Sequence, residues 1–209
     1  NKLRTTDDLP EVIYAREYDA AISPNGNIPV HAFNLISPTF FANSSTGNKY
    51  SLWVNVYGVS ERYLNVYGEK DLRAQMNQFF HRTYTHPVDG TTLDMKMLCN
   101  CYWYDETAIL ETGKGTKDWN FYRYAETLLS AAEAIAQSSG VNAEAAGYLA
   151  QVKARANMEG KDVSTIASEL QRLGKQAFIE ECWKERLREF PLEMKIWDDC
   201  VRTGKFPVI

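Results

Sequence analysis

The sequence contains no long apolar run and no strong excess of charge of either sign. None of its segments approaches the about 18 consecutive apolar residues that a membrane-spanning helix needs. Its 27 acidic and 23 basic residues leave a formal net charge of −4. Nucleic-acid binding depends on clustered positive charge. We therefore expect neither a membrane-spanning helix nor a nucleic-acid partner from these 209 residues.

Metal-binding and catalytic signatures are scarce as well. The chain has three histidines and four cysteines, and its Cys99-x-Cys101 pair lacks the two-residue spacing of zinc sites. No Ser-His-Asp order, phosphate-binding glycine loop, His-Glu-x-x-His sequence or dinucleotide glycine pattern occurs. We expect the cysteines to be structural, as Cys182 on an apolar stripe indicates, and we expect no metal or cofactor.

Two regions of different texture divide the chain. Residues 1–121 are rich in aromatic residues, Asn, Gly and Pro, whereas residues 122–209 carry helical periodicity almost throughout. In the first region, alternating β-branched and aromatic residues predict strands at 11–18 and 92–104. Apolar residues at helical spacing predict a short helix at about 69–80. We interpret 1–121 as a loop-rich ligand-binding part and 122–209 as a helical part of one continuous unit.

The helical part opens with a predicted hairpin of two helices. Apolar residues at i, i+3 and i+4 spacing form a stripe from Phe121 to Ala136, and Gly140 is placed to end that helix in the left-handed conformation. Asn142 is a good N-cap for a second helix with an alanine-rich stripe. The span 123–156 has the length of one tetratricopeptide-type hairpin, about 34 residues.

A third helical segment is expected from near Ser164, with a break at Gly174. Pro191 removes a backbone donor and interrupts the helix, and the apolar face then continues to Gly204, which is suited to end it. The hairpin and the segment 175–202 all carry apolar stripes that need cover. We therefore expect them to pack together in a mainly α fold.

Charged residues interrupt these apolar stripes. Glu126 and Glu133 lie two turns apart, and a pair of carboxylates is the machinery of glycoside hydrolysis. The alternative is structural, because carboxylates packed against arginines of neighbouring helices normally form bidentate pairs. We favour the structural interpretation, with Arg155, Arg186 or Arg188 as the partners.

The third segment repeats the same problem. Glu189 lies one turn from Glu185 and one turn from Glu193, and like charges at i, i+4 are unfavourable on an isolated helix. Such spacing makes sense when cations from elsewhere pair with the carboxylates, and Arg123 and Arg155 could supply them. We therefore predict structural ion pairs for Glu189 too.

Aromatic rings among polar residues in the first region give the ligand hypothesis. Sugars bind by stacking their apolar C–H faces on aromatic rings, while amides hydrogen-bond their hydroxyls. The segment 28–53 combines both residue types. The candidate ligand contacts are rings and amides outside any periodic stripe: Asn34, Phe40, Phe41, Asn43, Trp53 and, later in the chain, Trp103. For each ring the alternative is a place in the core, since aromatic side chains dominate burial.

Six phrases of the sequence, in chain order, resemble the SusD/RagB family of Bacteroidetes outer-membrane lipoproteins. They are E-V-I-Y-A-R-E-Y (11–18), Y-G-E-K-D-L-R (67–73), R-Y-A-E-T-L-L-S-A-A-E-A (123–134), L-A-Q-V-K-A-R-A (149–156), E-R-L-R-E-F-P-L-E (185–193) and W-D-D-C-V-R-T-G (197–204). The resemblance implies a SusD-like fold, mainly α, with a tetratricopeptide-type hairpin, packed C-terminal helices and a loop-rich region carrying a few short strands.

The same resemblance implies a function. Family members capture glycans at the cell surface, work with a TonB-dependent SusC-like outer-membrane transporter, and are not enzymes. It further implies that this chain corresponds to the middle-to-late part of a much longer protein, attached to the outer membrane only through a lipid anchor outside this segment.

Two other functions are open at this stage. Residues 123–204 could form a helical protein-protein interaction module without glycan binding. A glycoside hydrolase would instead need two carboxylates converging beside the aromatic residues. Its candidates are the acidic residues of the first region: Asp89, Asp94, Asp105 and Glu106.

Overall fold

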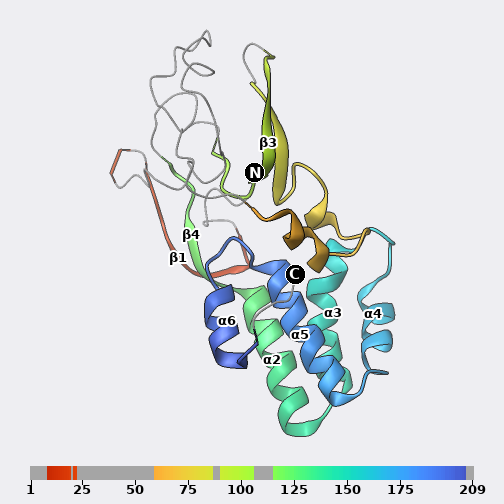
Figure 1. The fold of residues 1–209 in the computed structure, drawn as a ribbon. Helices are drawn as coiled ribbons and strands as arrows, with labels where there is room; N and C mark the ends of the chain where they lie inside the picture. Colours follow the sequence, from red (N-terminus) through yellow and green to blue (C-terminus); the bar gives the residue numbers. More distant parts are fainter. Residues whose placement is uncertain (1–8, 20, 23–58, 87–89, 106–114, 206–209) are drawn as a thin grey trace. The chain divides into compact units, whose positions relative to one another are not determined.

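The computed structural model describes residues 9–19, 21–22, 59–86, 90–105 and 115–205 (Figure 1). Its chain divides into two compact units that interleave in sequence. The predicted ligand segment 28–53 lies outside the described residues.

Unit 1 takes its described residues from 9–10, from between Ala15 and Leu64, and from between Ala74 and Asn120. Unit 2 combines Glu11–Tyr14, Asn65–Arg73 and the chain from Phe121 onward. Short segments from early in the sequence therefore belong to the unit that the C-terminal helices build.

Unit 1 contains an antiparallel pair of strands, β2 (Phe80–Thr85) and β3 (Thr92–Asn100). The register pairs the two ends of β2 with the opposite ends of β3, and it shifts between His81 and Thr83, where the regular pairing is interrupted. The predicted strand at 92–104 is thus present, four residues shorter than expected at its C-terminal end.

The predicted helix at about 69–80 is wrong. Only a short 3-10 turn, η3 (Leu72–Ala74), forms there, after a longer 3-10 helix, η2 (Glu61–Val66). Asn77 adopts a φ of 66°, a left-handed backbone that ends any right-handed helix. Upstream, the Asp71 carboxylate accepts a hydrogen bond from the Arg73 backbone N–H at 3.0 Å and favours a local turn instead.

A second two-stranded sheet pairs β1 (Val12–Arg16) with β4 (Trp119–Arg123). The strand predicted at 11–18 is confirmed with shorter bounds. At one end of this sheet the Tyr124 backbone N–H donates to the Glu11 carbonyl at 2.7 Å, at the point where β4 passes directly into the first long helix.

That helix, α2 (Tyr124–Ser139), forms the predicted hairpin with α3 (Ala143–Ala156) (Figure 1). The Asn142 side chain caps α3 by accepting from the Ala145 N–H at 2.9 Å, as predicted. Gly140 ends α2 with φ 82° and ψ 178°. This extended backbone is open only to glycine and differs from the left-handed helical one expected.

Three further helices belong to unit 2: α4 (Val163–Leu170), α5 (Lys175–Glu189) and α6 (Ile196–Thr203). The predicted break at Gly174 is confirmed, since Gly174 is the N-cap of α5. Gly204 ends α6 in the left-handed conformation, with φ 66° and ψ 14°.

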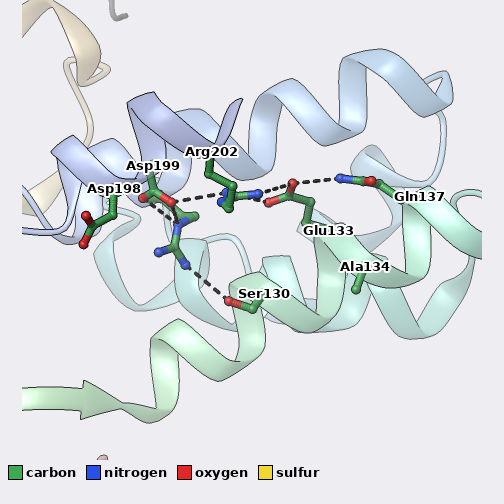
Figure 2. Close-up of a pocket in the computed structure, with 8 residues that line it drawn as sticks. Ser130, Glu133, Ala134, Gln137, Asp198, Asp199 and Arg202 are labelled. Carbon is green, nitrogen blue, oxygen red and sulfur yellow. Dashed lines mark hydrogen bonds and ion pairs between the residues drawn. The ribbon is translucent and has the colours of Figure 1, made fainter. Parts of the chain in front are cut away.

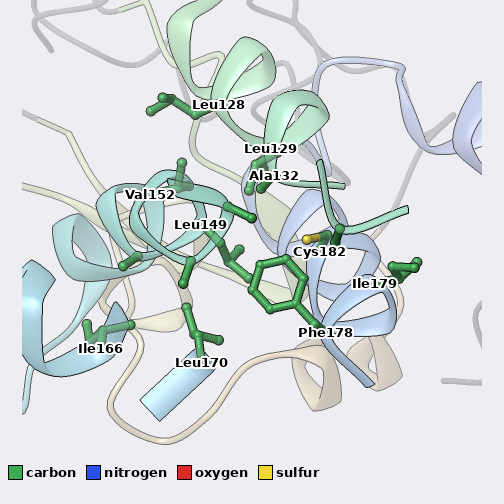
Figure 3. Close-up of a cluster of buried hydrophobic side chains, with 14 of the residues drawn as sticks. Leu128, Leu129, Ala132, Leu149, Val152, Ile166, Leu170, Phe178, Ile179 and Cys182 are labelled. Atoms are coloured by element: carbon green, nitrogen blue, oxygen red, sulfur yellow. The ribbon is translucent and has the colours of Figure 1, made fainter. Parts of the chain in front are cut away.

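The core of unit 2 lies between α2, α3, α4 and α5 (Figure 3). Leu129, Leu149, Phe178 and Cys182 are completely buried in it. Alanines line the facing sides of α2 and α3, and small side chains let the two helix backbones approach closely: Ala132, Ala136, Ala145, Ala146 and Ala150. The predicted packing of the hairpin on the 175–202 segment is therefore confirmed through α5.

Replacing Leu149 by alanine should lower the free energy of unfolding by about 2–5 kcal/mol, because it leaves a cavity in a fully packed core. Urea unfolding followed by circular dichroism measures the change. The matched control is Leu72→Ala, at a leucine with 40% of its surface exposed, which should shift the midpoint far less. Equal effects of the two substitutions would contradict this location of the core.

Candidate functional site

A cluster of buried charges lies at the end of α5 in unit 2. Glu189, whose side chain is 1% exposed, accepts from Arg73 at 2.9 Å and from Arg123 at 3.0 Å. It also pairs with Arg155 of α3. Three guanidinium groups from separate parts of the sequence thus converge on one buried carboxylate, which we call the Glu189 cluster.

Arg123 extends this cluster toward the strands. Its guanidinium donates to Glu193 at 2.6 Å and pairs with Glu11, the residue just before β1. The Phe190 ring lies 5.1 Å from the guanidinium carbon and covers it. One arginine, at the junction of β4 and α2, therefore ties both strands to the C-terminal helices of unit 2.

Glu185 forms the other end of the cluster. Its carboxylate lies 2.9 Å from Arg73 and 3.0 Å from Arg188, with Lys153 at 3.7 Å. Burial alone would raise the pKa of this carboxyl, but the surrounding positive charges outweigh burial and hold the pKa below its ordinary value. The like-charge spacing along α5 is thus compensated by cations from other elements.

Glu193 behaves differently. Burial raises the pKa of its carboxyl, and the nearby negative charge of Glu189 adds to the rise, although Arg123 opposes it. The pKa of the Glu193 carboxyl is thus shifted upward, whereas the pKa of the Glu185 carboxyl is shifted downward.

The two carboxylates predicted on α2 are also paired. Glu126 lies 3.3 Å from Arg186 and 2.5 Å from Lys195. Glu133 lies 2.7 Å from Arg202 of α6, which the sequence did not suggest as its partner. Burial would raise the pKa of Glu133, but the hydrogen bonds from Arg202 lower it overall.

Glu133 and Arg202 line a pocket of about 430 Å³ on unit 2 (Figure 2). Ser130, Gln137 and Asp199 also line it, and several of these groups bond to one another: Gln137 donates to Glu133 at 2.8 Å, and Arg202 contacts Asp199 at 3.2 Å. A general acid needs a raised pKa. The lowered pKa of Glu133 therefore fits a structural ion pair rather than acid catalysis.

The carboxylates of the first region do not supply a catalytic pair among the described residues. Asp105 is buried and accepts from Thr116, at 2.9 Å from the backbone N–H and 3.3 Å from the hydroxyl. Asp94 lies on β3 with an exposed side chain. Asp89 and Glu106 lie outside the described residues.

Trp103 is the one predicted ligand contact that the structure describes. Its side chain is 5% exposed, and its ring stacks on Trp119 with centroids 5.0 Å apart. The Lys117 ammonium lies 5.5 Å from the ring. The role of Trp103 in ligand binding stays a prediction, as do those of the candidates outside the described residues: Asn34, Phe40, Phe41, Asn43 and Trp53.

Sequence reasoning named Glu189 and Arg155 but gave no charge-pairing role to Arg73 or Glu11. Both lie in phrases that carried the family resemblance, at 67–73 and 11–18, which was the available signal. In the described part of the chain, no group of His, Cys, Asp and Glu could hold a metal ion, and no helix is long and apolar enough to cross a membrane.

The chain was compared with known protein families, curated proteins and solved structures. The SusD family model matches residues 40–206. No curated protein matches the chain.

Among solved structures, a SusD superfamily protein from Parabacteroides distasonis has a TM-score of 0.76 and 22% identity, covering 95% of this chain and 40% of its own. Surface glycan-binding protein A from Bacteroides thetaiotaomicron, in complex with laminarihexaose, has a TM-score of 0.61 and 19% identity, covering 93% and 43%. This chain thus spans about two-fifths of the length of each, and the likeness concerns the fold. With the family model matching most of its residues, the chain belongs to the SusD family.

Proposed function

We propose that this chain is the glycan-binding part of a cell-surface protein that captures oligosaccharides without cleaving them. The observation that carries the proposal is membership of the SusD family over residues 40–206. A relative of the same fold, surface glycan-binding protein A from Bacteroides thetaiotaomicron, is solved with laminarihexaose bound.

The state of the carboxylates supports capture without hydrolysis. Glycoside hydrolysis needs one carboxyl with a raised pKa beside a second free carboxylate. In unit 2, Glu126 and Glu133 are instead paired with cations of α5, α6 and the residue before α6. Carboxylates paired with cations in this way hold helices together.

For the location of the glycan we keep the segment 28–53. Phe40, Phe41 and Trp53 would stack on sugar faces, and Asn34 and Asn43 would bond to hydroxyls. Trp103, stacked on Trp119, is the weaker candidate, because a ring with 5% of its surface exposed offers little face to a sugar.

Membership of the family is the basis on which we propose a partner and a location. We propose that the complete protein is an outer-membrane lipoprotein exposed at the cell surface. It would deliver its glycan to a TonB-dependent SusC-like transporter. Co-purification of the native protein with such a transporter from detergent-solubilised membranes is the direct check of this partnership.

The protein should bind at least one neutral oligosaccharide and release no product from it. The suitable panel is laminarihexaose, maltohexaose, cellohexaose and xylohexaose, measured by isothermal titration calorimetry. A reducing-end assay on the same samples, with a known glycosidase as positive control, measures turnover. New reducing ends at enzymatic rates would support the hydrolase alternative instead.

Replacing Trp53 by alanine should weaken binding of the tightest panel member by several-fold, because a stacked ring contributes on the order of 1 kcal/mol. The melting temperature should stay nearly unchanged. The matched variant is Trp103→Ala, which removes a ring buried in unit 1 and should lower the melting temperature. Unfolding by Trp53→Ala would show that this ring is part of the core.

A further inference from the structure

Strands β1 and β4 pair with each other, and the residues of both strands that belong to unit 2 include exposed aromatic rings. Tyr14, Phe121 and Tyr122 are 59%, 42% and 57% exposed. The Tyr14 ring stacks on Phe121 with centroids 5.5 Å apart, and it lies 6.4 Å from the ring of Tyr122. We call these three residues the aromatic ribbon. Exposed apolar side chains that adjoin one another are a mark of interaction sites.

Contacts of Arg123, Tyr124 and Glu11 fix the strands that carry the aromatic ribbon. Tyr122 directly precedes Arg123, and Glu11 lies three residues before Tyr14, so both strands are attached to the partly buried ion pair between Arg123 and Glu11. The Tyr124 N–H to Glu11 carbonyl bond closes the same end of the sheet. Rings fixed on such strands lose little conformational entropy when a ligand binds.

Polar groups surround the rings. Within the part of the chain that the structure describes, the hydroxyls of Tyr14 and Tyr122 make no hydrogen bond, so both can bond to a ligand. The Lys195 ammonium lies 5.2 Å from the Tyr122 ring and donates to the Phe121 carbonyl at 2.5 Å. Its charge is already matched by Glu126, also at 2.5 Å.

We propose that the aromatic ribbon is a second sugar-stacking surface, in addition to the segment 28–53, and that it takes a neutral oligosaccharide; this rests on the proposed function. A pyranose has an apolar C–H face and hydroxyls at its edge. The exposed rings of Tyr14 and Tyr122, with a hydroxyl at each rim, match both features. The ligand is neutral because Lys195, the cation at the ribbon, is paired with Glu126.

The test compares three variants for the panel oligosaccharide that the wild type binds most tightly. The double variant Tyr14→Ala/Tyr122→Ala should bind about ten-fold more weakly, because two stacking contacts are lost. Tyr122→Phe keeps the ring but loses one hydroxyl, so it should bind more weakly than the wild type and more tightly than the double variant. Trp197→Ala removes a ring of α6 that is 66% exposed but outside the ribbon, and it should leave the affinity unchanged.

A footprinting measurement on the wild type makes the test independent of mutant folding. Acetylation of tyrosine hydroxyls by N-acetylimidazole, followed by mass spectrometry, should be slowed at Tyr14 and Tyr122 when the oligosaccharide is present. Tyr148, whose hydroxyl is engaged with Glu144 at 2.9 Å on α3, is the internal control and should not change.

The outcomes separate the two proposals. Wild-type protein that binds no panel member overturns the proposed function and the ribbon together. Wild-type binding with unchanged affinity in the double variant, or without protection of the two tyrosines, overturns the ribbon alone. A double variant that changes only the sedimentation coefficient would identify the ribbon as a protein-docking surface and also overturn it. Equal weakening by Trp197→Ala would show that the effect is not specific to these rings.

Discussion

The buried carboxylate of Glu189 is the interaction on which unit 2 depends. It binds Arg73 from the segment Asn65–Arg73, Arg123 from the junction of β4 and α2, and Arg155 from α3. These arginines are 116, 66 and 34 residues away in sequence. The apolar stripes supply the driving force for helix packing, whereas this cluster specifies which distant segments join the helices and in what arrangement.

Such a cluster is stable only when it is complete. Moving a charge out of water costs several kcal/mol, and mutual attraction offsets this cost only with good geometry and full pairing. The raised pKa of Glu193 and the lowered pKa of Glu185 show that the balance differs between neighbouring carboxylates. The charged residues in the sequence phrases that resemble the family therefore act structurally, by joining separate segments of unit 2. We propose that ligand recognition falls to aromatic residues elsewhere in the chain.

The sequence predicts what local periodicity and end signals determine. The hairpin, its Asn142 cap and the breaks at Gly174 and Gly204 all follow from residues close together in the chain. The 69–80 helix fails because apolar spacing cannot reveal the left-handed backbone at Asn77. Long-range pairing was equally hidden. The spacing of like charges in the sequence indicates that Glu189 needs a cationic partner. Only the fold shows that Arg73 is one of its partners.

The proposed sugar contacts were less predictable than the fold, because residues that contact a sugar need follow no sequence period. An exposed ring and a core ring look alike in sequence, as Tyr122 and Trp103 illustrate with 57% and 5% of their surfaces exposed. Residue types suggested the ligand class. The aromatic ribbon became visible only when β1 and β4 placed Tyr14 beside Phe121.

A double-mutant cycle between Arg123 and Glu189, joined at 3.0 Å, tests most directly whether the buried charges form one cooperative framework. Urea unfolding would be measured for Arg123→Met, Glu189→Met and the double variant. Each single substitution should cost about 3–5 kcal/mol, because it strands buried charges. The double variant should be more stable than the sum of the singles by about 0.5–3 kcal/mol. Strictly additive losses would contradict the account.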